Sequence, residues 1–357
     1  MRVLVTGGAG FIGSNLVRLL VRRGETVLNL DKLSYAGNLA SIADVAGLPG
    51  YEFRRVDLCD DAAVERALEE FRPERVIHLA AETHVDRSID APRAFLESNV
   101  AATFHLLEAC RRYWQGLPAK GAAEFRLLHA STDEVYGALG RDGVFTETTP
   151  YAPRSPYAAT KAASDHLARA WRHTFGLPVI VTNSSNNYGP WQYPEKLIPT
   201  TLVRALRGEP IPVYARGENV RDWIFVDDHC RALWTVATRG AVGETYNIGA
   251  CCERRNIDLV GALCQLLDEL RPRDDRASYA EQIEFVADRP GHDFRYAIDA
   301  GKIRRDLGWA PEMEFAAGLR HTVQWYLANE PWWQPLTIVG GMAAAPAAAV
   351  SAGEAPA

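Results

Sequence analysis

The stretch Arg2-Val3-Leu4-Val5-Thr6-Gly7-Gly8-Ala9-Gly10-Phe11-Ile12-Gly13 decides the fold of this 357-residue chain. Its first five residues form a short, mostly apolar run, which is typical of a buried parallel strand. The glycines that follow fit both G-x-x-G-x-x-G and G-x-G-x-x-G, and apolar residues then recur with helical spacing from 11 to 23, up to Gly24. A strand, a glycine-rich turn and a helix in this order predict the first unit of a doubly wound sheet.

The same alternation continues along the chain. We expect further strands at residues 26–30, 52–56, 75–79, 125–131 and 178–183. Helices are expected at 61–71 and 91–113, and Ser155-Pro156 opens another, with proline near its first turn. The predicted fold class is therefore α/β, a Rossmann-type doubly wound parallel sheet with a smaller C-terminal lobe that binds substrate.

The composition limits the classes of function. A net charge of −6 argues against a broad nucleic-acid-binding surface, so an anionic ligand must meet local positive charge. No apolar run reaches the ~18 residues of a membrane span, and Met1 to Gly7 enters a strand without a signal peptide, so we expect a cytoplasmic protein. The six cysteines show no C-x-x-C and the nine histidines no ligand array, which predicts reduced thiols and no metal.

The glycine-rich turn predicts a dinucleotide cofactor. Glycines let the backbone approach a pyrophosphate, and the helix N-terminus supplies N–H donors. Asp31 ends the second strand, where a carboxylate accepts hydrogen bonds from ribose hydroxyls and repels a 2′-phosphate; this favours NAD over NADP, although Lys32 weakens the preference. Asp57 either meets the adenine edge or caps its own turn. The small residues in Leu79-Ala80-Ala81 leave room for the cofactor.

Reactive groups gather in Ser131-Thr132-Asp133-Glu134-Val135-Tyr136-Gly137 and Tyr157-Ala158-Ala159-Thr160-Lys161. Tyr157 and Lys161 lie four residues apart on one helix face. We expect the ammonium to lower the pKa of the phenol, so that Tyr157 acts as a base toward a hydroxyl during hydride transfer. Thr132 ends the preceding strand, where its hydroxyl can bond the same substrate oxygen.

The adjacent carboxylates Asp133 and Glu134 suit a second reaction. Neighbours on a regular strand point to opposite faces, so both reach one site only if the strand has ended, which Gly137 permits. Glu134 would then remove the acidic hydrogen at carbon 5 of a 4-keto sugar, and protonated Asp133 would protonate the departing carbon 6 hydroxyl. Two carboxyls in one pocket raise one pKa, which helps to keep one protonated. Taken alone, an Asp-Glu pair is equally consistent with a solvated acidic turn.

Residues 1–336 resemble the extended short-chain dehydrogenase/reductase superfamily and, within it, the dTDP-glucose 4,6-dehydratases. Besides the two reactive segments, the resemblance rests on H-L-A-A-E-T-H-V-D-R-S (78–88), S-N-N-Y-G-P (185–190), P-E-K-L-I-P (194–199), R-D-W (221–223), Y-N-I-G (246–249) and A-D-R-P-G-H-D (287–293). It implies conversion of dTDP-glucose to dTDP-4-keto-6-deoxyglucose and water. The steps would be oxidation at carbon 4, elimination of water across carbons 5 and 6, and hydride return to carbon 6.

The resemblance also implies a tightly bound NAD that is regenerated in each turnover, and a homodimer formed through the helix near 91–113 and the helix that holds Tyr157. Catalytic roles fall to Thr132, Asp133, Glu134, Tyr157 and Lys161. Cofactor contacts fall to Gly7, Gly10, Phe11, Ile12, Gly13, Asp31, Lys32, Leu33, Ser34, Asp57, Leu58, Leu79, Ala80, Ala81, Thr83, Ser98, Tyr157, Lys161 and Asn187. Substrate contacts fall to Thr83, Thr132, Asn186, Lys196, Leu197, Pro212, Tyr214, Arg221, Asn256, Arg289 and His292.

Other functions remain open at this point. A 4-epimerase or a UDP-glucuronate decarboxylase of the same fold has no use for the Asp133-Glu134 pair. GDP-mannose dehydratases resemble T-S-E at this position, whereas UDP-glucose dehydratases share T-D-E but usually differ from the segment 287–293. A non-catalytic NAD-binding regulator would typically have lost Tyr157 or Lys161.

The pattern of elements predicts three regions. Residues 1–188 form an NAD-binding Rossmann domain that carries the catalytic residues. Residues 189–336 form mainly a nucleotide-sugar-binding lobe, with segments such as 222–226 returning to the main sheet. Residues 337–357 are rich in alanine and proline from Met342 onward and are expected to be a disordered tail without a catalytic role.

Overall fold

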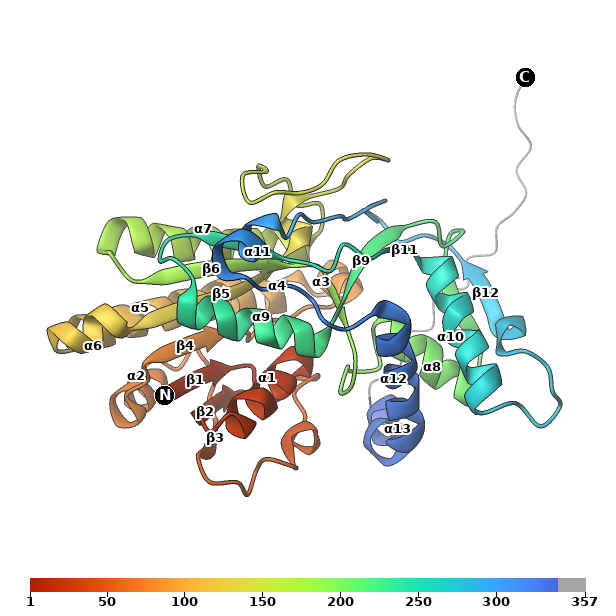
Figure 1. Cartoon of the computed structure of the whole chain (residues 1–357), viewed down its shortest axis with the longest axis horizontal. Coiled ribbons are helices and arrows are strands. Elements are labelled where there is room, and N and C mark those ends of the chain that lie inside the picture. The colour runs from red at the N-terminus through yellow and green to blue at the C-terminus, as the bar shows by residue number, and fades with distance from the viewer. Residues whose placement is uncertain (340–357) are drawn as a thin grey trace.

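A computed structural model describes residues 1–339 of the chain (Figure 1). Seven strands form one parallel sheet in the order β10-β6-β5-β4-β1-β2-β3. Their bounds are β1 Arg2–Thr6, β2 Thr26–Asp31, β3 Tyr51–Arg55, β4 Arg75–His78, β5 Arg126–Thr132, β6 Val179–Ser184 and β10 Thr245–Ile248. The strand order reverses between β1 and β4, and open sheets of this kind bind ligands at that reversal.

Helices cover both faces of the sheet. Val3 and Val5 of β1 pack on the face covered by α1 (Phe11–Arg22), α9 (Val226–Arg239) and α11 (Gly301–Leu307). Leu4, between them, packs on the opposite face with α2 (Asp61–Phe71), α5 (Ala102–Gln115) and α7 (Pro156–Phe175). This two-residue alternation buries both faces and explains the apolar strand sequences. Short helices complete this part: η1 Leu39–Ile42, α3 Val85–Asp90, α4 Pro92–Phe95, η2 Leu96–Ala101, α6 Ala119–Glu124 and η3 Asp133–Tyr136.

The second lobe lies beside the carboxyl ends of the strands (Figure 1). It contains a three-stranded sheet, β11-β9-β7, and a two-stranded one, β12-β8. The strands are β7 Asn186–Tyr188, β8 Ile211–Tyr214, β9 Val220–Phe225, β11 Glu253–Arg255 and β12 Ile283–Val286. The helices are α8 Leu197–Leu206, α10 Asn256–Leu270, η4 Tyr279–Gln282, α12 Phe315–Ala328 and α13 Glu330–Val339. Their apolar faces share one separate core.

Three expectations about the elements were wrong or incomplete. The segment 222–226 does not return to the main sheet; β9 pairs with β7 and β11, because β10 takes the place beside β6. The helix expected at 91–113 is interrupted, since Pro92 starts α4 and a π-helical turn, η2, precedes α5. Residues 337–339 belong to α13 rather than to a tail, and 340–357 lie outside the described residues.

The end of β5 follows the prediction. The strand stops at Thr132 and the 3₁₀-helix η3 begins at Asp133, so the two carboxylates do not follow strand geometry. Gly137 closes η3 with φ of +91°, a conformation that favours glycine. In the described part of the chain, no helix combines the length and the apolar character needed to cross a membrane.

Candidate active site

A cavity of about 190 Å³ lies at the carboxyl ends of β1 to β4, beside the glycine-rich turn. Gly10 is the N-cap of α1 and has no side chain to cap the first turn, so the first N–H groups of this helix can meet a phosphate. A Cβ on Gly13 would lie 2.0 Å from the Gly7 carbonyl oxygen, so this close turn requires glycine. An unblocked helix end at the strand reversal fits a dinucleotide pyrophosphate.

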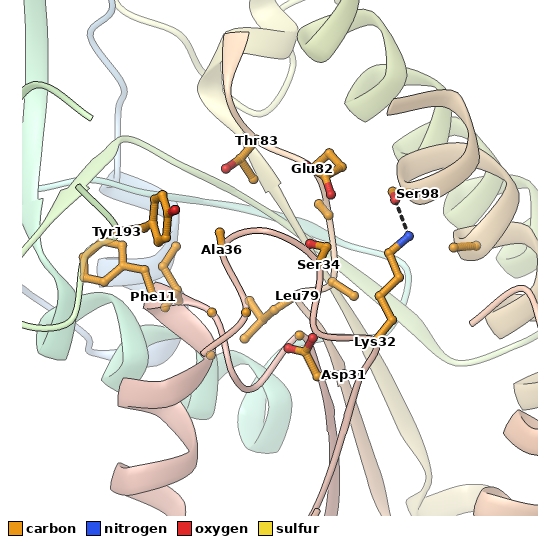
Figure 2. A pocket seen from close by; sticks show the side chains of 18 of the residues that line it. Phe11, Asp31, Lys32, Ser34, Ala36, Leu79, Glu82, Thr83, Ser98 and Tyr193 are labelled. Carbon is orange, nitrogen blue, oxygen red and sulfur yellow. Dashed lines mark hydrogen bonds between the residues drawn. The ribbon is translucent and has the colours of Figure 1, made fainter. Parts of the chain in front are cut away.

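Asp31 and Lys32 lie on the wall of this cavity, where the ribose end of a dinucleotide would reach (Figure 2). Asp31 accepts the N–H groups of Ala9 at 2.9 Å and Leu33 at 2.8 Å. Burial raises the pKa of this carboxyl, whereas the two N–H groups oppose the shift. Lys32 Nζ donates to Ser98 Oγ at 2.7 Å, as Figure 2 shows, so the ammonium is engaged by the π-helical turn.

The structure places nearly all predicted cofactor residues on this cavity or the next one. The residues on this cavity are Gly7, Gly10, Phe11, Ile12, Gly13, Asp31, Lys32, Ser34, Asp57, Leu58, Leu79, Ala80, Ala81, Thr83 and Ser98. Asp57 also caps its own turn by accepting the Cys59 N–H at 3.0 Å, whereas its contact with the adenine edge stays a prediction. Leu33 was predicted to contact the cofactor, but it lines neither cavity. Its backbone N–H donates to Asp31, and its φ is +58°.

A second cavity of about 510 Å³ adjoins the first. The residues that line both are Phe11, Ile12, Leu79, Ala81, Thr83, Gln192, Tyr193, Glu195 and Lys196. It lies between the main sheet and the second lobe. Its wall holds every predicted catalytic and substrate residue, together with Asn187: Thr83, Thr132, Asp133, Glu134, Tyr157, Lys161, Asn186, Lys196, Leu197, Pro212, Tyr214, Arg221, Asn256, Arg289 and His292. Residues from both lobes therefore meet around one cavity.

The carboxylates sit at the start of η3. Thr132 Oγ1 accepts the Glu134 N–H at 3.3 Å and donates to Asp133 Oδ1 at 3.4 Å. Asp133 is only 1% exposed, and burial, reinforced by the charge of Glu134, raises its pKa well above the ordinary value. A raised pKa favours the protonated form of this carboxyl, which is the form that a general acid needs. Burial also raises the pKa of Glu134, but nearby cations oppose the shift, namely Arg289, Lys196 and Arg221.

Tyr157 and Lys161 are buried on α7, one turn apart. The expectation that Lys161 lowers the pKa of the phenol was wrong for the protein by itself: burial raises that pKa, Glu134 adds to it, and the Thr132 hydroxyl opposes it. Lys161 Nζ instead donates to the Ala130 carbonyl oxygen at 2.8 Å. Burial lowers the pKa of Lys161, and the charge of Asp165 opposes this shift.

The sequence is closely similar to those of known proteins. Residues 4–322 match the model of a family described as GDP-mannose 4,6 dehydratase. A dTDP-glucose 4,6-dehydratase of Neisseria meningitidis serogroup B is 58% identical over 337 residues, 93% of this chain and 95% of the relative. The dTDP-glucose 4,6-dehydratase 1 of Escherichia coli K12 is 54% identical over 342 residues, 93% of this chain and 94% of that protein. The chain belongs to the dTDP-glucose 4,6-dehydratase family.

Solved structures agree with membership of the dTDP-glucose 4,6-dehydratase family. DesIV, the dTDP-glucose 4,6-dehydratase from Streptomyces venezuelae, was solved with NAD bound; it has a TM-score of 0.86 and 45% identity, over 94% of this chain and all of that one. A UDP-glucose 4-epimerase from Thermus thermophilus, in complex with NAD, has a TM-score of 0.80 and 33% identity, over 92% and 100%. The shared fold therefore does not by itself separate dehydration from epimerisation.

The three basic residues expected to meet a diphosphate are held in place by protein oxygens. Lys196 Nζ donates to the Thr83 carbonyl oxygen at 2.6 Å. Arg289 Nη1 lies 3.2 Å from Asp86 Oδ1, and Tyr214 donates to the other oxygen of that carboxylate at 2.9 Å. The guanidinium of buried Arg221 donates to main-chain carbonyls, which leaves its charge without a carboxylate partner in the described residues.

Sequence reasoning missed several residues of the dehydratase site. Residues His84, Asp86, Arg87, Gln192, Tyr193 and Glu195 line the second cavity as well. Most of them stand inside the quoted motifs 78–88 and 194–199, which was the available signal. Asn99 had none: its side chain joins Thr160 of α7 to the backbone of Glu82, and so ties the helix of Tyr157 to the cavity wall. Among residues 1–339, no cluster of three or more metal-type side chains is present.

Proposed function

We propose that this chain is an NAD-dependent hydro-lyase that converts dTDP-glucose into dTDP-4-keto-6-deoxyglucose and water. The observation that carries the proposal is the wall of the second cavity. It brings Tyr157, Lys161 and Thr132 together with the buried carboxyl of Asp133 and the half-buried carboxyl of Glu134, next to the cavity that fits a dinucleotide. When bound, NAD accepts a hydride from carbon 4 and returns it to carbon 6.

The residues divide the proton transfers among themselves. Tyr157 takes the proton of the carbon 4 hydroxyl, with the Thr132 hydroxyl bonding the same oxygen. Glu134 removes the proton of carbon 5, which the adjacent ketone makes acidic. Asp133 donates its proton to the carbon 6 hydroxyl, which leaves as water. Glu134 then returns its proton to carbon 5. Tyr157 releases its proton to water and Asp133 regains one, so the residues are restored, and the sugar has lost one water without net oxidation or reduction.

Residues of the second lobe would bind the diphosphate of the nucleotide. Lys196, Arg221 and Arg289 bring positive charge to one cavity of a protein whose net charge is −6. Charge-assisted contacts to a diphosphate are stronger than neutral hydrogen bonds, and those contacts would hold the sugar against η3. The thymine preference draws support from the names of the relatives.

The test uses purified protein without added NAD. It is incubated separately with dTDP-glucose and UDP-glucose, and the products are identified by mass spectrometry. Loss of one water from dTDP-glucose alone is the expected result and also demonstrates retained NAD. Loss from UDP-glucose instead would keep the mechanism and overturn the nucleotide assignment. No loss from either, even with NAD supplied, would favour the 4-epimerase, which needs the oxidation but no elimination.

We also propose a homodimer in the cytoplasm. Phe104 of α5 and Phe175 of α7 are each 41% exposed and both contact Trp171, which forms an aromatic row across the two helices. Burial of such a row against a second copy removes apolar surface from water. Light scattering should give twice the chain mass, and Phe104→Arg should reduce it. All six cysteines are free thiols, which suits a reducing compartment, and cell fractionation tests that location.

A further inference from the structure

The loop 32–38, which follows β2, forms one wall of the cofactor cavity. Ser34, Ala36 and Gly37 line the cavity, whereas Tyr35 does not. Figure 2 shows Ser34 and Ala36 among the side chains that surround it. The Tyr35 side chain is not part of the lining, and its partners determine where this wall is held.

Those partners come from two segments that lie far from the loop in the sequence. The Tyr35 hydroxyl donates to Glu195 Oε1 at 2.9 Å, and the guanidinium carbon of Arg87 lies 3.5 Å from the centre of the Tyr35 ring. The ring also packs edge-on against Tyr193, at 5.6 Å between centroids. Glu195 and Tyr193 belong to the segment before α8, and both line the cofactor cavity themselves. The hydrogen bond thus joins two walls of one cavity.

The chemistry of this junction favours a closed state. The bond between the phenol and the carboxylate is charge-assisted, and a cation over an aromatic ring adds a second attraction. Glu195 directly precedes Lys196, whose ammonium donates to the Thr83 carbonyl oxygen at 2.6 Å. Thr83 lines both cavities, so the junction is continuous with the wall that the substrate would meet.

We propose that Tyr35, Glu195 and Arg87 form a latch that holds the loop 32–38 closed over the cofactor cavity and retains NAD between turnovers. This inference rests on the proposed function, in which NAD is restored in every cycle and has no need to leave. Tyr35 is a positioning residue, because it lines neither cavity. Opening of the latch would precede each release of NAD.

The experiment compares release of NAD from the full-length protein and from Tyr35→Phe, which keeps the ring and removes only the hydroxyl. Tyr279→Phe is the matched control, since it also removes a tyrosine hydroxyl bond, 2.9 Å to the Arg271 carbonyl oxygen, but in the second lobe away from both cavities. Each protein is loaded with labelled NAD, freed of excess and diluted into unlabelled NAD. Retained label is then followed over time, without any sugar nucleotide.

We expect Tyr35→Phe to release NAD at least about ten-fold faster, because a hydrogen bond to a charged group is lost. Tyr279→Phe should match the natural protein, and saturating NAD should restore the kcat of Tyr35→Phe with only the KM for NAD raised. Glu195→Gln keeps an acceptor but loses the charge, so it should release NAD faster than the natural protein and more slowly than Tyr35→Phe. If Tyr35→Phe does not fold, Glu195→Gln takes its place in the test.

Equal release rates for the natural protein and both latch variants would overturn the latch, as would a natural protein that holds no NAD. The latch would also be overturned if Tyr35→Phe and Tyr279→Phe both released NAD faster and both lost thermal stability. A chain that retains NAD through Tyr35 but leaves dTDP-glucose unchanged would overturn the proposed dehydration and leave the latch standing.

Discussion

The Thr132 hydroxyl lies 3.4 Å from Asp133 Oδ1, while Asp133 Oδ2 has no hydrogen-bond partner within residues 1–339. One oxygen of a nearly fully buried carboxyl is thus left for a ligand, in the wall of the cavity where the sugar would lie. An unsatisfied buried polar atom costs stability, and the place of this one in the cavity wall fits a group kept for function. We therefore expect substitution of Asp133 to change stability and activity in opposite directions.

Replacement of Asp133 by Asn should stabilise the protein in a pH-dependent way. Burial raises the folded-state pKa of Asp133 above its value of about 4 in the unfolded chain, so its contribution to stability is lost as pH rises through the folded pKa. Asp133→Asn should therefore raise the Tm at neutral pH by roughly 2–4 °C, and the gain should shrink as pH falls through the folded pKa and be absent near pH 4. Calorimetry at both pH values measures this; an equal gain at both would contradict the assigned pKa shift. Water loss in this variant should be nearly absent.

Glu134→Gln should separate the two reactions. The amide cannot accept the carbon 5 proton, so water loss should fall by about 10²–10⁴-fold, while NAD binding and the first oxidation persist. Product analysis and the absorbance of bound NADH check both parts. Glu284→Gln, on exposed β12, is the control and should behave like the natural protein. Full turnover of Glu134→Gln would show that another group is the base.

Tyr157→Phe should stop the reaction one step earlier. Without the phenol, no group on α7 takes the proton from the carbon 4 hydroxyl, so formation of bound NADH should slow by about 10²–10⁴-fold. Stopped-flow absorbance after mixing with dTDP-glucose measures that step, and Tyr279→Phe again provides the comparison. NADH formation at the natural rate would remove Tyr157 from its assigned role.

Gly13→Ala should prevent cofactor binding. The added methyl would lie 2.0 Å from the Gly7 carbonyl oxygen, so the turn beside the pyrophosphate site must move. We expect loss of retained NAD together with a lowered Tm. Gly47→Ala offers a fair control, since its added methyl meets no atom within 4 Å. Undiminished NAD content in Gly13→Ala would show that the cofactor does not depend on this close turn.

Much of the active site could be predicted from local sequence, because its spacing is local. The glycine-rich turn, the end of β5 at Thr132, and the i,i+4 relation of Tyr157 and Lys161 depend on residues close together in the chain. The direction in which the pKa of Tyr157 shifts was not predictable from the sequence. It depends on burial and on Glu134, which the helix spacing does not report.

Sequence by itself predicted the strands β1 to β6 of the main sheet, the glycine-rich turn and the residues that we propose as the reacting groups, since periodicity, turn chemistry and residue type are properties of short segments. Tertiary structure alone decided that β10, not β9, lies beside β6, because strand pairing depends on competition between distant segments for one sheet edge. It also decided that Tyr35 meets Glu195 across 160 positions of sequence, and that Asp133 is buried, which raises the pKa of its carboxyl. Burial and long-range contact arise only when the chain folds around its cavities. Burial raises the pKa of Asp133, and long-range contact forms the proposed latch.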